Sequence, residues 1–511
     1  MKILLSFFFC SFSLLVCSQN NNSYQPPVFS DNERLKKMEA AFPIIEKLFK
    51  EHAAKNHFPG MAFGIVADGK LVYSGGFGFT DVAKKIPANS KSIFRIASMS
   101  KSFTGLAILK LRDEGKLNLD DAASKYISAL LKVKYLTTDA PPITIRNLLT
   151  HTAGFPEDNP WGDRQLADTD AELIKTITDG VQFSNIPGYA YEYSNLGFAL
   201  LGNIITKVSG NPYQQYINEN ILKPLQMNST FWEYSKVPQG ALAQGYRWIN
   251  NNWREEELLH DGSYGAMGGM LTSIEDFSHY ITLHLSAWPP SNENKSMVLK
   301  NSSIREMHNP WQVTGFNAQF KFPNGRLCPV VSGYGYGLGW TKDCEGKIWV
   351  GHSGGLPGFG SQWRIFPEYG IGIVSFANLT YAGTGSINLK ALDTLIAIAK
   401  LKPRVLPPST ILKQRKDELI KLLPDWKQAE SSGIFAENFF PDNPIDSLKK
   451  QSASLYAKAG KIIRIGEIIP ENNLRGSFVI EGEKSNIEVF FTLTPENPPL
   501  IQELVLKELK K

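Results

Sequence analysis

The sequence lacks the residue patterns that hold metals and phosphates. Its 511 residues include four cysteines and eight histidines. The cysteines form no Cys-x-x-Cys pair and the histidines form no His-Glu-x-x-His helix, so no metal site is predicted. A Gly-x-x-x-x-Gly-Lys-Ser/Thr loop, which would cradle phosphates, is also missing. These absences predict a protein that works without a metal or another cofactor.

A strong excess of charge of one sign is absent as well. The chain has 54 basic and 49 acidic side chains, which give a formal net charge of +5. Charges of both signs are well mixed along the sequence. This pattern excludes a nucleic-acid-binding patch and a membrane-binding patch.

The apolar run at the start of the chain is too short to cross a membrane. It extends from Ile3 to Val16, with the small residue Ser18 shortly after it. A membrane span needs about 18 residues or more, so residues 1–18 fit a secretory signal peptide better. We therefore expect a secreted or periplasmic protein with no transmembrane span in the mature chain. A lipid anchor at Cys17 is the alternative, but bulky Val16 stands where lipoprotein signals usually have a small residue.

Two cysteines remain after the predicted signal peptide. Cys328 and Cys344 lie close together in sequence, across a predicted loop. In an oxidising compartment this proximity permits a disulfide, and two free thiols are the alternative.

The stretch Ser98-Met99-Ser100-Lys101 carries the strongest chemical signal in the chain. Residues three apart share a face of a helix, so the Lys101 amine can lie beside the Ser98 hydroxyl. Lysine can remove a serine proton only if burial or nearby charge lowers its pKa from about 10.4. Ser98 is therefore a candidate nucleophile and Lys101 its candidate base. A second Ser-x-x-Lys pattern, from Ser447 to Lys450, has polar surroundings and is predicted to be a solvated helical face.

Two further motifs follow in order. Tyr193-Ser194-Asn195 comes after a turn-rich segment, and His352-Ser353-Gly354-Gly355 closes a predicted strand. The order Ser-x-x-Lys, Tyr-x-Asn, His-x-Gly resembles that of the serine hydrolases related to class C β-lactamases and D-alanyl-D-alanine carboxypeptidases. The blocks that resemble this family span roughly residues 35 to 400: Phe94–Lys101, Leu148–Gly154, Gly268–Ser273 and His352–Gly355.

The resemblance assigns a role to each motif. It implies that Ser98 attacks an acyl carbon, that Lys101 takes the serine proton, and that Tyr193 relays a proton to the leaving group. The backbone N–H groups of Ser98 and Gly355 would bind the oxyanion. The residues implied to bind substrate are Asn195, His352, Ser353, Gly354 and Gly355.

Several of these residues have simpler interpretations. Tyr193 could cap a core with its hydroxyl in water, and its place in the ordered set favours function. His352 could be a hydrogen-bonded structural residue at a strand end, and the adjoining Ser-Gly-Gly favours a site role. Tyr216 also begins a Tyr-x-Asn pattern, but it falls in a predicted helix and is expected to pack. His151 is expected to be structural, at the end of a helix that Gly154 stops.

The predicted fold is an α/β fold like that of class C β-lactamases. It has an antiparallel sheet flanked by helices, a helical subdomain, and a small C-terminal α+β domain. The predicted elements include a helix from Glu33 to His57, a hairpin of strands 61–67 and 71–77, and strands over 347–352, 360–366 and 370–377. The proline-rich stretch near residues 403–408 predicts a boundary. The expected organisation is a signal peptide (1–18), a flexible leader (19–32), a hydrolase domain (33–402), and a linker with the C-terminal domain (403–511).

The expected function is that of a secreted serine hydrolase with a small-molecule or peptide substrate. D-amino-acid peptides, small esters and small amides are the leading classes. His352 stands where class C β-lactamases have lysine, so weak β-lactam turnover is expected. The alternative is a catalytically silent, penicillin-binding-like protein that kept the pocket. The sequence predicts no oligomeric state.

Overall fold

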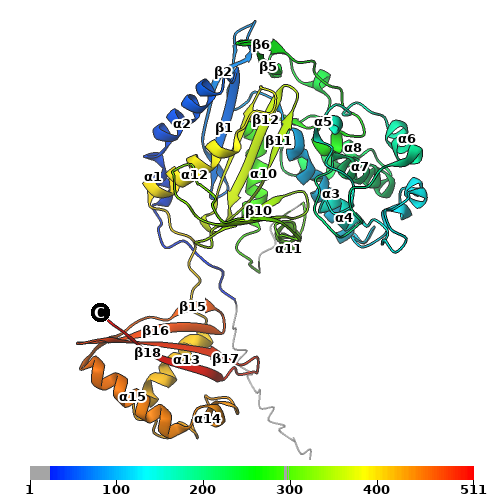
Figure 1. Ribbon diagram of the computed structural model, residues 1–511. Coiled ribbons are helices and arrows are strands. Elements are labelled where there is room, and N and C mark those ends of the chain that lie inside the picture. Colours follow the sequence, from blue (N-terminus) through cyan, green and yellow to red (C-terminus); the bar gives the residue numbers. More distant parts are fainter. Residues whose placement is uncertain (1–23, 293–295, 297) are drawn as a thin grey trace, which may run out of the picture. The chain divides into compact units, whose positions relative to one another are not determined.

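The computed structural model describes residues 24–292, 296 and 298–511. The predicted signal peptide, the alternative anchor at Cys17 and residues 19–23 of the predicted leader lie outside these residues. The chain divides into two compact units, one of residues 29–404 and one in which residues up to Val28 join residues 405–511 (Figure 1). Within the second unit, Val28 and Val405 exchange two backbone hydrogen bonds of 3.0 and 2.8 Å.

A nine-stranded antiparallel sheet forms the centre of the first unit. Its strand order is β3-β2-β1-β13-β12-β11-β10-β9-β8, so the first and last long strands of the unit lie side by side. The strands are β1 (Gly60–Ala67), β2 (Lys70–Asp81), β3 (Ile86–Pro87), β8 (Gln312–Asn317), β9 (Val330–Tyr334), β10 (Gly339–Asp343), β11 (Ile348–Leu356), β12 (Phe359–Phe366) and β13 (Ile371–Ala377).

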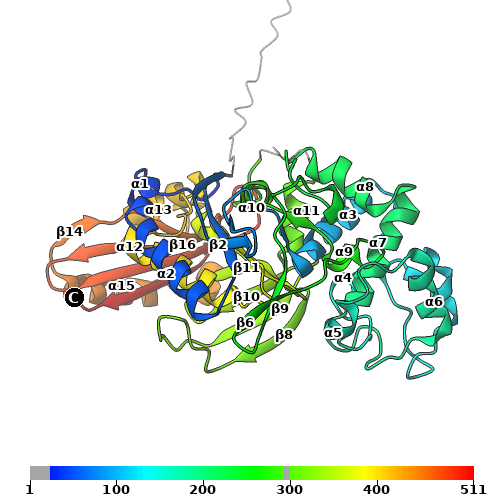
Figure 2. The same cartoon turned by 90° about the horizontal axis from the view of Figure 1, so that it is seen from above.

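Helices cover both faces of this sheet, which is why the central strands are apolar throughout. All eight residues of β1 and all seven of β13 are buried. One face carries α1 (Arg34–Glu39), α2 (Phe42–Lys55) and α12 (Gly385–Ala399), and the other carries α10 (Ile274–Ser286) (Figures 1 and 2). These layers confirm the predicted α/β fold with a large antiparallel sheet flanked by helices.

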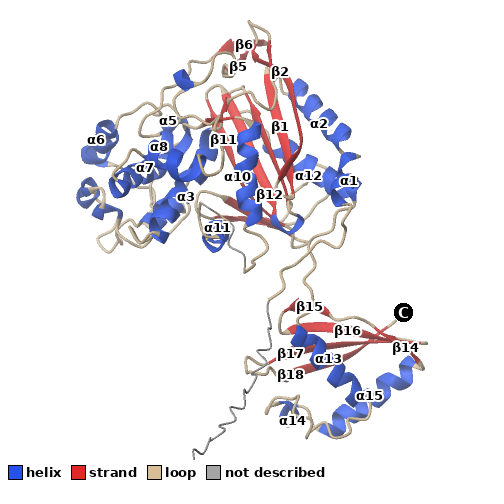
Figure 3. Ribbon diagram, turned by 180° about the vertical axis from the view of Figure 1, so that it is seen from behind, coloured by secondary structure: helices blue, strands red, loops and turns tan. Residues whose placement is uncertain are grey.

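The remaining helices of the first unit gather beside one end of the sheet (Figure 3). The α-helices are α3 (Ser100–Asp113), α4 (Ile145–Leu149), α5 (Asn159–Gly162), α6 (Asp170–Gly180), α7 (Asn195–Ser209), α8 (Tyr213–Ile217), α9 (Gly265–Gly268) and α11 (Asn301–Met307). Short helical turns are η1 (Ala97–Met99), η2 (Ala123–Lys125), η3 (Ser128–Lys132), η4 (Asn218–Leu222), η5 (Tyr234–Lys236) and η6 (Pro367–Tyr369). Two small ribbons pair β4 (Phe94–Arg95) with β7 (Leu271–Thr272) and β5 (Tyr246–Ile249) with β6 (Asn252–Glu255).

Two local predictions were wrong. The single helix expected from Glu33 to His57 is two helices that break at Ala40 and Ala41, because Pro43 has no N–H to continue a helix and instead occupies the first turn of α2. His352 was expected at the end of a strand, but β11 continues to Leu356. Glycine permits this continuation, since a Cβ at Gly354 would lie 2.2 Å from the Ile96 carbonyl oxygen.

Other local predictions were right. Strands β1 and β2 form the expected hairpin, and its tip has Asp68 and Gly69 at φ values of 48° and 76°, as a type I′ turn requires. A disulfide joins Cys328 to Cys344, which resolves the open choice in favour of pairing.

The second unit is a five-stranded antiparallel sheet with helices against one face (Figure 3). Strict alternation of buried and half-exposed residues along β16 and β17 shows that only one face of these strands is covered. The elements are α13 (Thr410–Leu422), α14 (Phe439–Asp442), α15 (Ile445–Ala459), β14 (Ile462–Ile465), β15 (Ile469–Asn472), β16 (Arg475–Gly482), β17 (Asn486–Leu493) and β18 (Ile501–Leu509). In neither unit does a described helix have the length and apolar character that a membrane span needs.

Candidate active site

Ser98 lies at the junction between the sheet and the helical part of the first unit. Strand β4 ends at Arg95, Ala97 takes the left-handed conformation (φ 49°), and the turn η1 leads directly into α3. An alanine rarely adopts this conformation, so the surrounding contacts must hold it. The Ser361 hydroxyl donates to the Ile96 carbonyl at 2.7 Å, and the Ser100 hydroxyl donates to the Ala97 carbonyl at 2.7 Å.

Lys101 is completely buried beside Ser98. Its Nζ lies 2.9 Å from the Ser98 Oγ, 2.6 Å from the Asn195 Oδ1 and 3.0 Å from the Met267 carbonyl oxygen. Burial lowers the pKa of Lys101 to about 7, against the opposing charges of Asp163 and Asp158. A neutral amine has two N–H donors, and the Asn195 and Met267 oxygens accept both. The nitrogen lone pair is then left for the Ser98 hydroxyl proton.

Tyr193 closes the other side of the serine. Its ring centroid lies 4.8 Å from the Lys101 Nζ, and an interaction of its hydroxyl with the Ser98 side chain acts to lower the Tyr193 pKa. Burial raises the pKa of Tyr193 well above its usual value, so the phenol is protonated at neutral pH. The structure therefore brings Ser98, Lys101 and Tyr193 into one contact group, as their sequence pattern predicted.

Asn195 is held in place by a carboxylate that the sequence analysis did not single out. Asn195 is the first residue of α7, where the Ser194 hydroxyl caps the helix. The Asp158 carboxylate accepts hydrogen bonds from the backbone N–H groups of Asn195 (2.6 Å) and Leu196 (2.9 Å). A carboxylate at a helix N-terminus also interacts favourably with the helix dipole. Asp158 thereby fixes the helix end that presents Asn195 to Lys101.

His352 lies near Tyr193, with 6.3 Å between the ring centroids. Its Nδ1 is bonded to the Ser353 carbonyl and must donate, so its Nε2 accepts from the Tyr334 hydroxyl at 2.9 Å. Burial, together with the charge of the nearby Lys101, lowers the pKa of His352 to about 3. His352 is consequently a neutral histidine with both ring nitrogens already engaged.

His151 is closer to the site than its predicted structural role implied. Its ring centroid lies 4.2 Å from that of Tyr193, and its Nδ1 accepts from the Ser194 N–H at 3.0 Å. His151 therefore supports the loop that carries Tyr193 and Ser194, which fits a structural role exerted at the site itself.

The rest of the third motif lies on the last part of β11, which pairs with β12 but extends beyond its pairing with β10. Ser353 is exposed, and Gly354 and Gly355 are partly buried. A Cβ on Gly355 would lie 2.8 Å from the ring of Tyr381, so glycine is required for this close approach.

Tyr381 and Asp163 form a second group that the sequence did not reveal. The Tyr381 hydroxyl donates to the Asp163 carboxylate at 2.8 Å, although the two residues are 218 positions apart. Asp163 is almost fully buried, and burial raises its pKa to about 6. No local pattern around Trp161-Gly162-Asp163 marks a functional residue, so only the folded arrangement places this carboxylate near Lys101.

The two competing motifs have other surroundings. Ser447 and Lys450 are exposed on α15 of the second unit. Tyr216 is a buried residue of α8.

A cavity of about 420 Å³ opens beside the Ser98 group. Tyr193, Tyr334, His352 and Ser353 line its near end, and Arg364 and Gly385 line another part. Among the described residues, no set of three or more histidine, cysteine, aspartate or glutamate side chains could hold a metal ion.

This fold and these contacts define a serine hydrolase-type or penicillin-binding-protein-like protein. The chain belongs to the beta-lactamase family, whose profile matches residues 45–397. Protein flp of Staphylococcus aureus (strain MW2) is 32% identical over 379 residues, which cover 73% of this chain and 70% of that protein. Beta-lactamase-like protein 2 of Dictyostelium discoideum is 26% identical over 519 residues, covering 94% of this chain and 89% of that one.

Two solved structures share the fold. The octameric penicillin-binding protein homologue from Pyrococcus abyssi covers 92% of this chain and 96% of its own, with 23% identity and a TM-score of 0.57. The penicillin-binding protein from Bacillus halodurans covers 70% of this chain and 98% of its own, with 22% identity and a TM-score of 0.54.

Proposed function

We propose that this protein is a secreted serine hydrolase that acts through an acyl-enzyme on Ser98. The observation that carries the proposal is the set of three contacts around the buried Lys101 amine. Two of these contacts are to oxygens that only accept hydrogen bonds, so the neutral amine directs its lone pair at the serine.

The proposed reaction begins with transfer of the Ser98 proton to Lys101 as the serine oxygen attacks the acyl carbon. The backbone N–H groups of Ser98 and Gly355 stabilise the resulting oxyanion. Tyr193, protonated before the reaction, donates its proton to the leaving group and takes in its place the proton that Lys101 received from Ser98. Water then attacks the acyl-enzyme by the reverse proton path and releases the acid. In this scheme Asn195, His352, Ser353 and Gly354 bind and orient the substrate.

The proposed substrates are D-amino-acid peptides and small esters or amides, with weak turnover of β-lactams. The neutral, fully bonded His352 supports the last point, because it offers no charge to a β-lactam carboxylate. Secretion or periplasmic location is proposed from the predicted signal peptide over residues 1–18.

Intact-mass measurement after exposure to a fluorophosphonate and to a penicillin tests the proposal. The expected result is one covalent adduct on the wild-type protein, none on Ser98→Ala, and an unchanged adduct on the control Ser447→Ala. Tyr193→Phe is expected to lower ester turnover by about a hundredfold or more, since general acid-base steps contribute on the order of 10² to 10⁴.

Adduct formation on Ser98→Ala would refute the assignment of the nucleophile. A folded wild-type protein that binds penicillin without forming any adduct would favour the silent ligand-binding alternative.

A further inference from the structure

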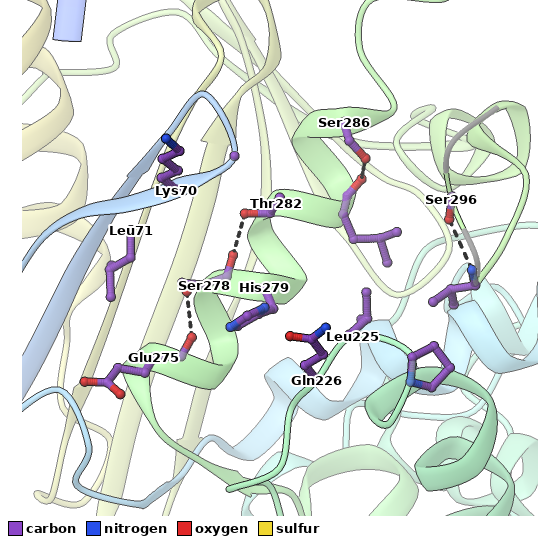
Figure 4. Close-up of a pocket in the computed structure, with 14 residues that line it drawn as sticks. Lys70, Leu71, Leu225, Gln226, Glu275, Ser278, His279, Thr282, Ser286 and Ser296 are labelled. Atoms are coloured by element: carbon purple, nitrogen blue, oxygen red, sulfur yellow. Dashed lines mark hydrogen bonds between the residues drawn. The ribbon is translucent and has the colours of Figure 1, made fainter. Parts of the chain in front are cut away.

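Two of the cavities that described residues line have walls that differ in an informative way. The larger, of about 630 Å³, lies between α10, the β1–β2 hairpin and the loop near Leu225 (Figure 4). There the hydroxyls of Ser278, Thr282 and Ser286 donate back to carbonyls of their own helix. The smaller cavity, beside Tyr193, has an arginine in its wall with unmet hydrogen-bonding capacity.

That arginine is Arg364 on β12. Its Nη2 donates to the Gly385 carbonyl at 3.3 Å, while its Nε and Nη1 are buried and have no hydrogen-bond partner in the described part of the chain. Burial lowers the pKa of Arg364 only to about 10, so the guanidinium remains a cation at neutral pH. Buried guanidinium donors without acceptors are costly, and a bound anion would remove that cost.

The N-terminus of α12 meets the same cavity. Gly385, which lines the cavity, is the first residue of this 15-residue helix. No side chain caps the helix, and the Thr384 hydroxyl at its N-cap is buried without a partner. Uncapped N–H groups and the helix dipole add positive potential next to the guanidinium.

Negative charge near Arg364 is limited. Among the residues that the structure describes, no aspartate or glutamate lines the cavity. Asp393 acts on Arg364 from further along α12, but its carboxylate is shared with Lys347, at 3.8 Å. The net potential of this wall therefore favours an anion.

The part of the cavity wall that contains Arg364 lies some distance from the proposed reacting atoms at Ser98. Arg364 pairs with Gly351 across the sheet, and Gly351 is four residues before Gly355 on β11. At about 3.3 Å per residue, Arg364 lies roughly 13 Å along the strand direction from Gly355, the proposed oxyanion donor. A group bound there is separated from the scissile bond by several atoms.

We infer that Arg364 and the N-terminus of α12 form a subsite for a carboxylate carried by the leaving group, remote from the scissile bond. This inference rests on the proposed hydrolase function and narrows its substrates to those with a distal carboxylate. The subsite lies on the leaving-group side because Tyr193, the proposed proton donor to that group, lines the same cavity.

A matched pair of aryl esters tests the subsite on the full chain. The pair is 4-(2-carboxyethyl)phenyl acetate and its methyl ester, which differ in one distal charge. The expected wild-type kcat/KM is roughly tenfold to a hundredfold higher for the carboxylate, as one charge-assisted hydrogen bond allows. Arg364→Gln is expected to bring the ratio close to one. Lys342→Gln is the control, since it removes an exposed cation of β10 outside the cavity and should keep the wild-type ratio.

A titration with the released phenol, 3-(4-hydroxyphenyl)propanoate, measures binding at the subsite without any turnover. Binding to the wild type that is lost in Arg364→Gln, but kept in Lys342→Gln, would support the subsite, even if neither ester is hydrolysed. Absence of hydrolysis would count against the hydrolase function only. Equal turnover of both esters by the wild type, or equal binding of the acid by the wild type and Arg364→Gln, would overturn the inference.

Discussion

At the scale of single residues, the chemistry of this site depends on what surrounds each ionisable group. Lys101 has no carboxylate among its hydrogen-bond partners. Burial lowers its pKa to about 7, although the charges of Asp163 and Asp158 oppose the decrease through space. The pKa of Lys101 is therefore set by a balance between the loss of hydration and two nearby negative charges.

This balance predicts the pH dependence of an Asp163→Asn enzyme. Removing the carboxylate removes an attraction for the ammonium form, so the pKa of Lys101 falls further. The acid limb of kcat/KM against pH, which rises as Lys101 loses its proton, should move to lower pH. The profile is measured with a neutral aryl ester from pH 5 to 9. Asp168→Asn is the control, because Asp168 does not act on the Lys101 pKa. An acid limb that stays in place, or moves to higher pH, would show that Asp163 does not tune the base.

His352 leads to a prediction about substrate choice. Its pKa of about 3 keeps it neutral from pH 5 to 9, and both of its nitrogens are bonded. We expect a chromogenic cephalosporin, whose carboxylate lies next to the scissile amide, to be hydrolysed at least tenfold less efficiently than a short aryl ester at every pH in this range. The two kcat/KM profiles provide the comparison. Efficient cephalosporin turnover would mean that neutrality at His352 does not limit β-lactam binding.

At the scale of elements, the motif spacing predicted some contacts and missed others. The i, i+3 relation was enough to place Lys101 beside Ser98, because both belong to one continuous helical segment. Asp158 and Asp163 flank the short helix α5 at its two ends, and Tyr381 comes from the loop after β13. Their relations to the site exist only after distant segments pack. The break between α1 and α2 was missed because an apolar helical period continues across it.

A second element-scale feature is the buried histidine pair that joins α10 to the end of α11. The Trp288 indole N–H donates to the His308 Nδ1 at 2.8 Å, so the His308 Nε2 donates to the His284 Nδ1, also at 2.8 Å. Burial lowers the pKa of His308 to about 3 and that of His284 well below its usual value. Both rings are neutral in the folded protein.

The pair predicts a loss of stability in acid. Each histidine binds a proton in the unfolded chain below about pH 6.5 but not in the folded one, so the free energy of unfolding falls as pH drops from 6.5 towards 3. The slope is up to about 1.4 kcal/mol per pH unit for each group. Denaturant unfolding at several pH values should give a shallower slope for His308→Gln than for the wild type. The exposed His260→Gln serves as control, and identical slopes for wild type and His308→Gln would contradict the assignment.

At the scale of the whole molecule, every proposed catalytic residue lies in the unit of residues 29–404. This unit has its own cores on both faces of the sheet, and the second unit has a separate one. The proline-rich stretch that suggested a boundary falls where the two units meet in sequence. The exact position of the boundary could not be predicted from the sequence. Arg404 donates hydrogen bonds to the Pro367 and Glu368 carbonyls and so belongs to the first unit.

A shortened chain of residues 29–404 is expected to fold and to keep at least part of the ester hydrolase activity. The reason is that each core is formed within one unit. Far-UV circular dichroism, thermal unfolding and fluorophosphonate labelling of the shortened chain provide the measurement. A folded but unlabelled protein would show that the C-terminal unit is needed to complete the site.

The complete burial of Lys101 has a consequence for when reactivity arises. An amine that acts as a base only when water is excluded is an ammonium ion in the unfolded chain, and Ser98 is then an ordinary alcohol. Reactivity would therefore arise in the same step as tertiary packing. An activity-based probe added while the denatured protein refolds should label only molecules that have finished folding.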